Sequence, residues 1–174
     1  MKNIEQNLEK YISEQDISRR IKEISCGISR SYYDKNPILI GILNGSFIFM
    51  SDLIRQLNID CEIDFIKISS YKGKKSTGNI IMSKGLDLDI KNRSVIIVED
   101  IIDSGKSINY LYDFISNFNP KDIAVISLLA KKNVSKLNFK IDFIGFEISS
   151  EFVVGYGLDY KQKLRNLNSI YKLM

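Results

Sequence analysis

Short runs of mainly apolar residues recur along this chain, and stretches with helical spacing separate them. The runs are "PILIGIL" (37–43), "VIIVED" (95–100), "IAVISLLA" (123–130) and "IDFIGF" (141–146). Such runs are typical of strands that are buried on both faces of a sheet. Strands that alternate with helices form right-handed βαβ units. The pattern therefore predicts an α/β fold, a doubly wound and mostly parallel sheet flanked by helices.

Helical spacing marks three of the separating stretches. Ser13 and Asp16 resemble a capping box, and isoleucines at 17, 21, 24 and 28 follow, so we expect a helix at about 14–33. "NGSFIFMSDLIRQL" (44–57) predicts a turn and a helix. Apolar residues at 108, 111, 112 and 115 predict a third helix, which ends near Asn119-Pro120.

Residues 61–79 have two different patterns. "CEIDFIKISSY" (61–71) alternates as a strand does, with Ile63, Phe65 and Ile66/Ile68 expected to face inward. "KGKKSTGN" (72–79) is polar and basic and contains glycine, which predicts a mobile loop.

The length of 174 residues, without a linker rich in Pro, Gly or Ser, favours a single domain over 1–174. No apolar run approaches the ~20 residues that span a bilayer, and the N-terminal residues carry acids where a signal peptide would be apolar. Cys26 and Cys61 are far apart in sequence, and we expect them to be buried thiols of a reducing compartment. The expected location is cytoplasmic.

The chain contains no histidine, which excludes Ser-His-Asp triads, His-ligated zinc and imidazole bases. Acid–base chemistry must then use Asp, Glu, Lys or Tyr. The net charge of +4 is compatible with an anionic small ligand or with nucleic acid, and requires neither.

The stretch "VIIVEDIIDSGKSI" (95–108) leads an apolar strand directly into Glu99, Asp100 and Asp103. Buried carboxylates are unfavourable unless something pairs with them, so this is either a solvated strand end or a functional site. In open parallel sheets, ligands bind beyond the carboxyl ends of the strands, where these acids are expected.

The next residues, Ser104-Gly105-Lys106-Ser107, open the expected helix. Backbone N–H groups and the helix dipole make such a turn a phosphate cradle, with the serine hydroxyls as further donors. Acids beside a phosphate cradle suit a sugar phosphate, because carboxylates accept hydrogen bonds from ribose hydroxyls or hold a metal through water. A Walker A loop is excluded, since Asp100 stands where that motif requires its first glycine.

These motifs resemble those of a known family. "VIIVEDIIDSGKSI" is similar to the phosphoribosyl-pyrophosphate (PRPP) signature of type I phosphoribosyltransferases, and the combination with "EFVVGYGLDY" (151–160) resembles the hypoxanthine-guanine phosphoribosyltransferase branch. "ILIGILNGSFIFMSDL" (38–53) is similar to its pyrophosphate-loop segment, "SSYKGKKSTGN" (69–79) to its flexible catalytic loop and "LLAK" (128–131) to its purine-contacting strand. The resemblance covers nearly all of the chain after the first helix.

The resemblance implies a purine salvage enzyme that transfers the phosphoribosyl group from PRPP to hypoxanthine or guanine and gives IMP or GMP and pyrophosphate. It also implies a requirement for Mg²⁺, a homodimer or homotetramer, and no nucleic-acid or membrane partner. A small hood, formed by about 147–174 with N-terminal residues, would close over the base. The peptide bond between Leu43 and Asn44 would be cis.

The resemblance also assigns roles to individual residues. Asp103 would exchange the proton at purine N7, and Ser70 and Tyr71 would lie where the flexible loop closes. The residues implied for PRPP are Glu99, Asp100 and Asp103 at the ribose, Ser104, Gly105, Lys106 and Ser107 at the 5′-phosphate, and Asn44, Gly45, Ser46 and Arg165 at pyrophosphate. The purine would contact Lys131 through O6, Phe152 by stacking, Val153 through its backbone, and Asp159. The implied metal ligands are Glu99, Asp100 and Asp159.

One position departs from the family pattern. Relatives usually have Lys or Arg before the glycine of the pyrophosphate loop, where this chain has Asn44. A cation that would face pyrophosphate is lost, although the backbone N–H groups of Gly45 and Ser46 can still bind.

Two other functions stay open at this point. Some proteins with this fold are regulators that bind PRPP or nucleotides and control transcription through nucleic acid; they often carry an added domain or a broad basic face. Among enzymes, the alternative is a phosphoribosyltransferase that prefers xanthine or another purine.

Overall fold

The computed structural model describes residues 8–70, 80–132 and 137–174. Its main sheet has six strands in the order β4-β3-β2-β5-β6-β7, in which only β4 is antiparallel to its neighbour. The strands are β2 (Ile38–Leu43), β3 (Glu62–Ser70), β4 (Ile80–Lys84), β5 (Ser94–Ile102), β6 (Asp122–Lys131) and β7 (Phe143–Ile148).

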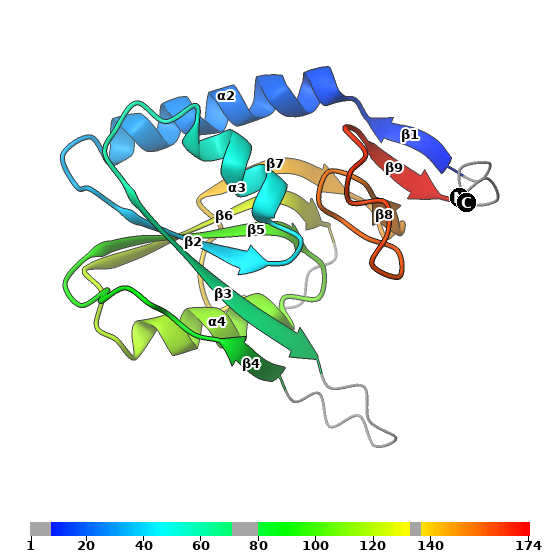
Figure 1. The fold of residues 1–174 in the computed structure, drawn as a ribbon. Coiled ribbons are helices and arrows are strands. Elements are labelled where there is room, and N and C mark those ends of the chain that lie inside the picture. Colours follow the sequence, from blue (N-terminus) through cyan, green and yellow to red (C-terminus); the bar gives the residue numbers. More distant parts are fainter. Residues whose placement is uncertain (1–7, 71–79, 133–136) are drawn as a thin grey trace.

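Helices cover both faces of this sheet. Helices α2 (Glu14–Ser31) and α3 (Phe47–Ile54) lie on one face, and α4 (Lys106–Ser116) lies on the other (Figure 1). The buried apolar residues accordingly form two clusters, one that contains the inward residues of α2 and α3 and one that contains those of α4. The predicted α/β fold, with a mostly parallel sheet between layers of helices, is confirmed.

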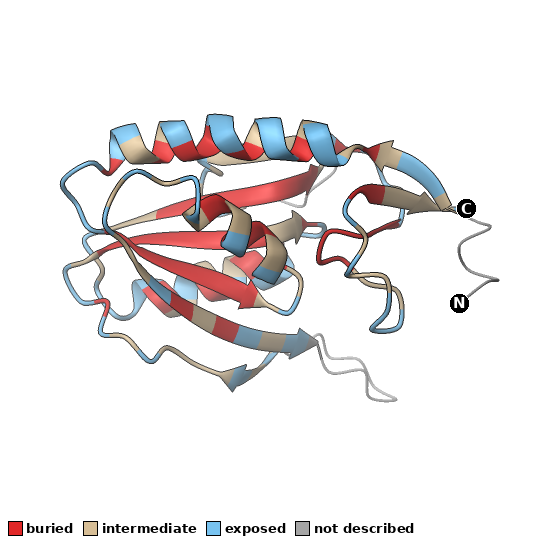
Figure 2. Ribbon diagram, turned by 45° about the horizontal axis from the view of Figure 1, so that its top comes forward, coloured by how far each residue is buried: buried red, intermediate tan, exposed pale blue. Residues whose placement is uncertain are grey.

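Helix α2 follows the predicted capping and spacing. The Ser13 hydroxyl accepts a hydrogen bond from Asp16 N at 3.1 Å, which satisfies one of the free N–H groups at the helix start. The isoleucines at 17, 21, 24 and 28 are buried against the sheet, and the opposite side of the helix is exposed (Figure 2). Cys26 lies on that opposite side, so its predicted burial was wrong; Cys61 is half-buried, and both cysteines are free.

Burial of the strands depends on their position in the sheet. The central strands β2, β5 and β6 are almost entirely buried, as their apolar runs predict. Strand β7 is mostly half-buried instead, because it is an edge strand with a neighbour on one side only.

The inward face of β3 differs from the prediction. Ile63 is 39% exposed, whereas Asp64 is buried at 4% exposure and Ile66 is fully buried. Alternation in this strand places Asp64, Ile66 and Ile68 on one face and Ile63 and Phe65 on the other, where Phe65 packs against the α2 and α3 cluster as predicted. Ile63 is exposed on that same face, so its predicted inward position was wrong.

Asp64 is held by four donors. Its carboxylate accepts from the backbone N–H groups of Phe65 (2.7 Å), Asp87 (2.7 Å) and Leu88 (3.1 Å), and from Lys84 Nζ (3.2 Å). Burial opposes ionisation, but these donors outweigh it and hold the pKa of the carboxyl below its ordinary value. Asp64 thereby fixes the chain after β4 against β3.

We expect Asp64→Asn to lower the free energy of unfolding at pH 7 by about 2 kcal/mol, because hydrogen bonds to a charged group contribute about 1.5–3 kcal/mol. A folded pKa below the unfolded value of about 3.9 stabilises the fold above that pH, and the contribution is lost as pH falls through the folded pKa. Urea unfolding of both proteins at pH 7 and near pH 3 measures the difference, which should shrink in acid.

Asp87→Asn is the matched control. This carboxylate also pairs with Lys84, at 2.9 Å, but it is 76% exposed. An exposed pair contributes about 0–1 kcal/mol, so the control should unfold close to wild type. Equal destabilisation by the two substitutions would contradict the role given to Asp64.

A second sheet joins the two ends of the chain. Strand β1 (Leu8–Ile12) pairs antiparallel with β9 (Ile170–Leu173), which also pairs with β8 (Val153–Val154). This sheet lies beside the carboxyl ends of β6 and β7 (Figure 1). In the described part of the chain, no helix is both long enough and apolar enough to cross a bilayer.

Candidate functional site

The strand order reverses between β2 and β5. The chain moves outward from β2 to β3 on one side, and from β5 through β6 to β7 on the other. Ligands of open α/β sheets bind at this switch point, beyond the carboxyl ends of the strands. The segments that leave these ends are residues 44–46 after β2 and 103–107 after β5, which are two of the predicted binding segments.

Residues 44–46 lie directly against the acids of β5. The Leu43–Asn44 peptide bond is cis, as predicted. A Cβ atom at Gly45 would lie 1.6 Å from Asp100 Oδ2, so only glycine leaves room for that carboxylate. Asn44 is exposed, whereas the Ser46 hydroxyl is buried and donates to Ile42 O at 2.7 Å. Backbone groups and the Asn44 amide are therefore what this loop offers to a ligand.

Glu99 and Asp100 are carboxyls in a desolvated position. Burial, followed by the charge of Asp100, raises the pKa of Glu99 well above its ordinary value. Burial also raises the pKa of Asp100 to about 6, although backbone donors and Arg165 act in the opposite direction. Glu99 Oε2 has no hydrogen-bond partner among the described residues. Unsatisfied buried polar atoms are rare in folded proteins, and a bound water or ion is one of the partners that can satisfy them.

The turn before α4 exposes donors. Gly105 has a φ of 78°, a conformation that glycine adopts without strain, and no side chain of the described residues caps the helix that starts at Lys106. Ser104, Lys106 and Ser107 are exposed. The turn, together with Glu99 and Asp103, lines a cavity of about 80 Å³. Free N–H groups at a helix start favour an anion, as the sequence predicts.

Asp103 and Lys131 form an ion pair. Asp103 follows β5 and Lys131 ends the neighbouring strand β6, and Lys131 Nζ lies 2.9 Å from Asp103 Oδ1. Both line a cavity of about 300 Å³ with Lys132, Ser149 and Ser150. The two serines were not among the predicted residues; nothing in their sequence context distinguishes them from a solvated loop. This cavity offers a cation and a carboxylate side by side.

Phe152 and Val153 come from the second sheet. Val153 is buried at the start of β8, whereas the Phe152 ring is 53% exposed and meets the Tyr160 ring edge to face at 6.1 Å. A half-exposed phenyl ring is available for stacking on a planar ligand.

Asp159 and Arg165 form a third group of the site. Arg165 Nη2 lies 2.7 Å from Asp159 Oδ1, and Arg165 Nη1 donates to Gly157 O at 2.7 Å. Gly157 lies against Gly45, which in turn lies against Asp100, so this pair lies next to Asp100, and the charges of both side chains act on the pKa of that carboxyl. The fold thus brings residues from four segments to one edge of the sheet: 44–46, 99–107, 131 and 159–165. Phe152 and Val153 follow Ser149 and Ser150, which line the cavity beside Lys131.

Ser70 and Tyr71 were predicted to lie where the flexible loop closes. Ser70 is the last residue of β3. Tyr71 and the loop 72–79 lie outside the described residues.

Comparison with known proteins adds to this geometry. A family model described as a phosphoribosyl transferase domain matches residues 8–161. The hypoxanthine phosphoribosyltransferase of Buchnera aphidicola is 45% identical over 166 residues, which are 94% of this chain and 94% of that relative.

Solved structures are similar over the same length. The hypoxanthine-guanine phosphoribosyltransferase of Bacillus anthracis, with a HEPES molecule in its active site, has a TM-score of 0.90 and 38% identity, and the match covers 95% of this chain and 98% of that one. The Trypanosoma cruzi hypoxanthine phosphoribosyltransferase in complex with the product IMP has a TM-score of 0.88 and 35% identity, with 97% and 95% covered.

Proposed function

The chain belongs to the phosphoribosyltransferase family, and we propose that it transfers the 5-phosphoribosyl group of PRPP to hypoxanthine or guanine. The products are IMP or GMP and pyrophosphate, which makes the protein a pentosyltransferase of purine salvage. The observation that carries this function is the pair of Lys131 and Asp103, 2.9 Å apart on a cavity of about 300 Å³ at the carboxyl ends of β5 and β6.

The pair matches one edge of a 6-oxopurine. Lys131 has three donors and no acceptor, which suits the O6 carbonyl, and the Asp103 carboxylate accepts the proton carried at N7. Phe152 stacks on the purine face, and the backbone of Val153 meets its edge. A base that enters this cavity takes the place of the ion pair, so each partner of the pair exchanges a charged contact for a contact with the purine.

The PRPP half of the site lies on the other side of Asp103. The turn at 104–107 binds the 5′-phosphate through N–H groups and serine hydroxyls. Glu99 and Asp100 accept hydrogen bonds from the ribose hydroxyls, and residues 44–46 with Arg165 bind pyrophosphate. Bond breaking at C1 develops positive charge on the ribose, so positioning and charge stabilisation supply most of the rate enhancement.

The acids of the site also suit Mg²⁺. Carboxylate oxygens are its preferred ligands, and the ion is usually held by one or two carboxylates, water and substrate phosphates. The unpartnered Oε2 of Glu99 fits that need, and among the residues that the structure describes no group of three or more potential ligands forms a cage without substrate. Glu99 and Asp100 would hold Mg²⁺ at the ribose, and Asp159 would be a Mg²⁺ ligand apart from them. Mg²⁺, when bound, would neutralise charge on pyrophosphate.

Three broader features belong to the same proposal. The second sheet and the segment from 147 onward act as a hood over the purine within a single domain of 1–174. The protein works as a homodimer or homotetramer, as the resemblance of its sequence to that branch of the family implies. Its location is cytoplasmic, which agrees with two free cysteines.

The direct test is an assay of the purified protein with PRPP, Mg²⁺ and one base at a time: hypoxanthine, guanine, xanthine or adenine. We expect nucleotide and pyrophosphate from hypoxanthine or guanine, and none when a chelator removes Mg²⁺. Absence of product with every 6-oxopurine would overturn the function, and a large excess of activity with xanthine would reassign the substrate.

Gly45 has no room for a side chain. Gly45→Ala places a methyl group on Asp100 Oδ2, so the loop or the carboxylate must move. We expect kcat/KM for PRPP to fall by about 10²-fold, because misplacement of reacting groups by about 1 Å has effects of that size. Steady-state kinetics at saturating hypoxanthine measure the change.

Gly85→Ala is the matched control for this substitution. The nearest atom to a Cβ at Gly85 is Met82 Sδ at 3.8 Å, an ordinary contact. The control should keep kcat/KM close to wild type. Near-normal PRPP kinetics in Gly45→Ala would show that the close approach to Asp100 does not matter for the reaction.

A further inference from the structure

Residues 155–157 have a backbone conformation that L-residues seldom adopt. The φ angles of Gly155, Tyr156 and Gly157 are 95°, 51° and 97°. Positive φ is uncommon for a bulky aromatic residue and persists where surrounding contacts hold it. Tyr156 N donates to Leu167 O at 2.8 Å, and its side chain is only 6% exposed.

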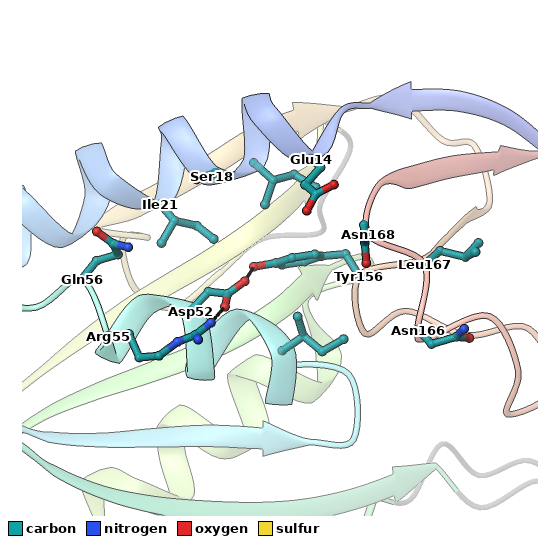
Figure 3. Close-up of a pocket in the computed structure, with 12 residues that line it drawn as sticks. Glu14, Ser18, Ile21, Asp52, Arg55, Gln56, Tyr156, Asn166, Leu167 and Asn168 are labelled. Carbon is teal, nitrogen blue, oxygen red and sulfur yellow. Dashed lines mark hydrogen bonds and ion pairs between the residues drawn. The ribbon is translucent and has the colours of Figure 1, made fainter.

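The side chain of Tyr156 reaches helix α3. Its hydroxyl donates to Asp52 Oδ2, while Asp52 Oδ1 pairs with Arg55 from the same helix. Figure 3 shows the Tyr156 ring pointing from the C-terminal segment toward Asp52, in the wall of a cavity of about 300 Å³ that α2, α3 and this segment enclose. Both carboxylate oxygens of Asp52 are therefore engaged.

Asp52 belongs to the same rigid piece of chain as the pyrophosphate loop. Helix α3 starts at Phe47, directly after residues 44–46, and Met50 N donates to Ser46 O at 2.8 Å. The helix therefore continues from the loop without a flexible connection. A bond that holds Asp52 also holds the orientation of this loop.

Gly157 makes a second contact between the same two segments. A Cβ atom at this position would lie 2.2 Å from Gly45 O, so the backbone of Gly157 lies directly on the pyrophosphate loop. Gly157 N also donates to Arg165 O at 2.9 Å. The left-handed segment thus contacts the loop on one side and Arg165 on the other.

We propose that Tyr156 is a positioning residue of the pyrophosphate subsite, which acts through Asp52 to fix the loop at 44–46 against Gly157 and Arg165. The inference rests on the proposed function. Tyr156 supports the loop from a distant part of the chain. This loop carries Asn44 at the position where relatives usually have a cation. The phenol stays protonated as a donor at neutral pH, because burial and then the Asp52 carboxylate raise its pKa.

The test compares two ligands of the same site. PRPP uses the pyrophosphate loop, whereas IMP carries purine, ribose and 5′-phosphate without pyrophosphate. For Tyr156→Phe, which keeps the buried ring and removes only the donor, we expect the Kd of PRPP to rise about tenfold, and the Kd of IMP to stay within about twofold, as loss of one charge-assisted bond predicts. Titration calorimetry measures both constants.

Three further variants keep the test independent of folding defects. Asp52→Asn weakens the same bond from the α3 side, because a neutral amide oxygen accepts less strongly than a carboxylate, and it should give the same pattern. The double variant should be no worse than Asp52→Asn alone, since that substitution already weakens the bond that Tyr156→Phe removes, in addition to the Arg55 pair. Tyr33→Phe, at a 73% exposed tyrosine, is the control and should match wild type.

The outcomes separate the inference from the function on which it rests. An unchanged Kd for PRPP in both single variants would overturn the positioning role. Equal weakening of PRPP and IMP would also overturn it, because that result indicates a general loss of structure. A wild-type protein that binds neither ligand would overturn the proposed function itself, and this inference with it.

Discussion

Asp103→Asn should lower turnover of hypoxanthine by about 10²–10⁴-fold, the contribution typical of a general acid or base. Asparagine has nearly the shape of aspartate but cannot accept the proton from N7. Asp103 is 65% exposed and paired with Lys131, so the substitution removes no buried packing. The loss should therefore appear in kcat, while the Kd of PRPP stays close to wild type.

Asp113→Asn is the control for Asp103→Asn. It makes the same chemical change on the exposed side of α4 and should leave kcat unaltered. Single-turnover kinetics separate the chemical step from product release. If Asp103→Asn turned over at near-normal rate, the proton transfer would have to be assigned elsewhere. If PRPP binding and kcat fell together, Asp103 would act chiefly in holding the ribose.

The sequence was sufficient to predict the elements in which burial is one-sided or complete. Strands β2, β5 and β6 are buried on both faces, and their continuous apolar runs are typical of such strands. The run at 141–146 looked the same but forms the half-buried edge strand β7. The Ser13 cap and the isoleucine stripe of α2 are local features and were found for that reason. The acids at 99, 100 and 103 stood out because an apolar strand leads directly into them.

Features that depend on partners distant in sequence could not be predicted. Ile63 and Asp64 are neighbours, and only the donors at residues 84–88 decide that the carboxylate faces inward. The second sheet pairs the first described strand with the last one. Likewise, the contact of Gly157 with Gly45 joins segments more than one hundred residues apart, and no local sequence pattern predicts it.

The site residues also differ in whether the local sequence could predict them. Composition and spacing pointed to the acids and the helix-initiating turn, whereas Phe152, Asp159 and Arg165 were expected only from the family resemblance. Each of these three has an ordinary local context, and each belongs to the C-terminal segment, whose position beside the sheet edge no local pattern predicts.

Wild-type protein should use hypoxanthine or guanine strongly and adenine almost not at all. Adenine carries an amino group at C6, which places a donor against the donors of Lys131. That side chain is 18% exposed in its pair with Asp103, and a base that separates the pair without offering an acceptor leaves a desolvated cation unpaired. Sites built to hydrogen-bond one group reject the mismatched analogue by as much as ~10⁴–10⁵-fold.

Lys131→Gln and Lys131→Ala should erode this preference, chiefly by weakening the 6-oxopurines. Ratios of kcat/KM for hypoxanthine, guanine and adenine measure the effect, with Lys140→Gln, at an exposed lysine, as the control for lost charge. Use of adenine by wild type within about tenfold of hypoxanthine would correspond to only ~1.4 kcal/mol of discrimination. Lys131 would then not read O6, and the assignment of the 300 Å³ cavity to a 6-oxopurine would fail.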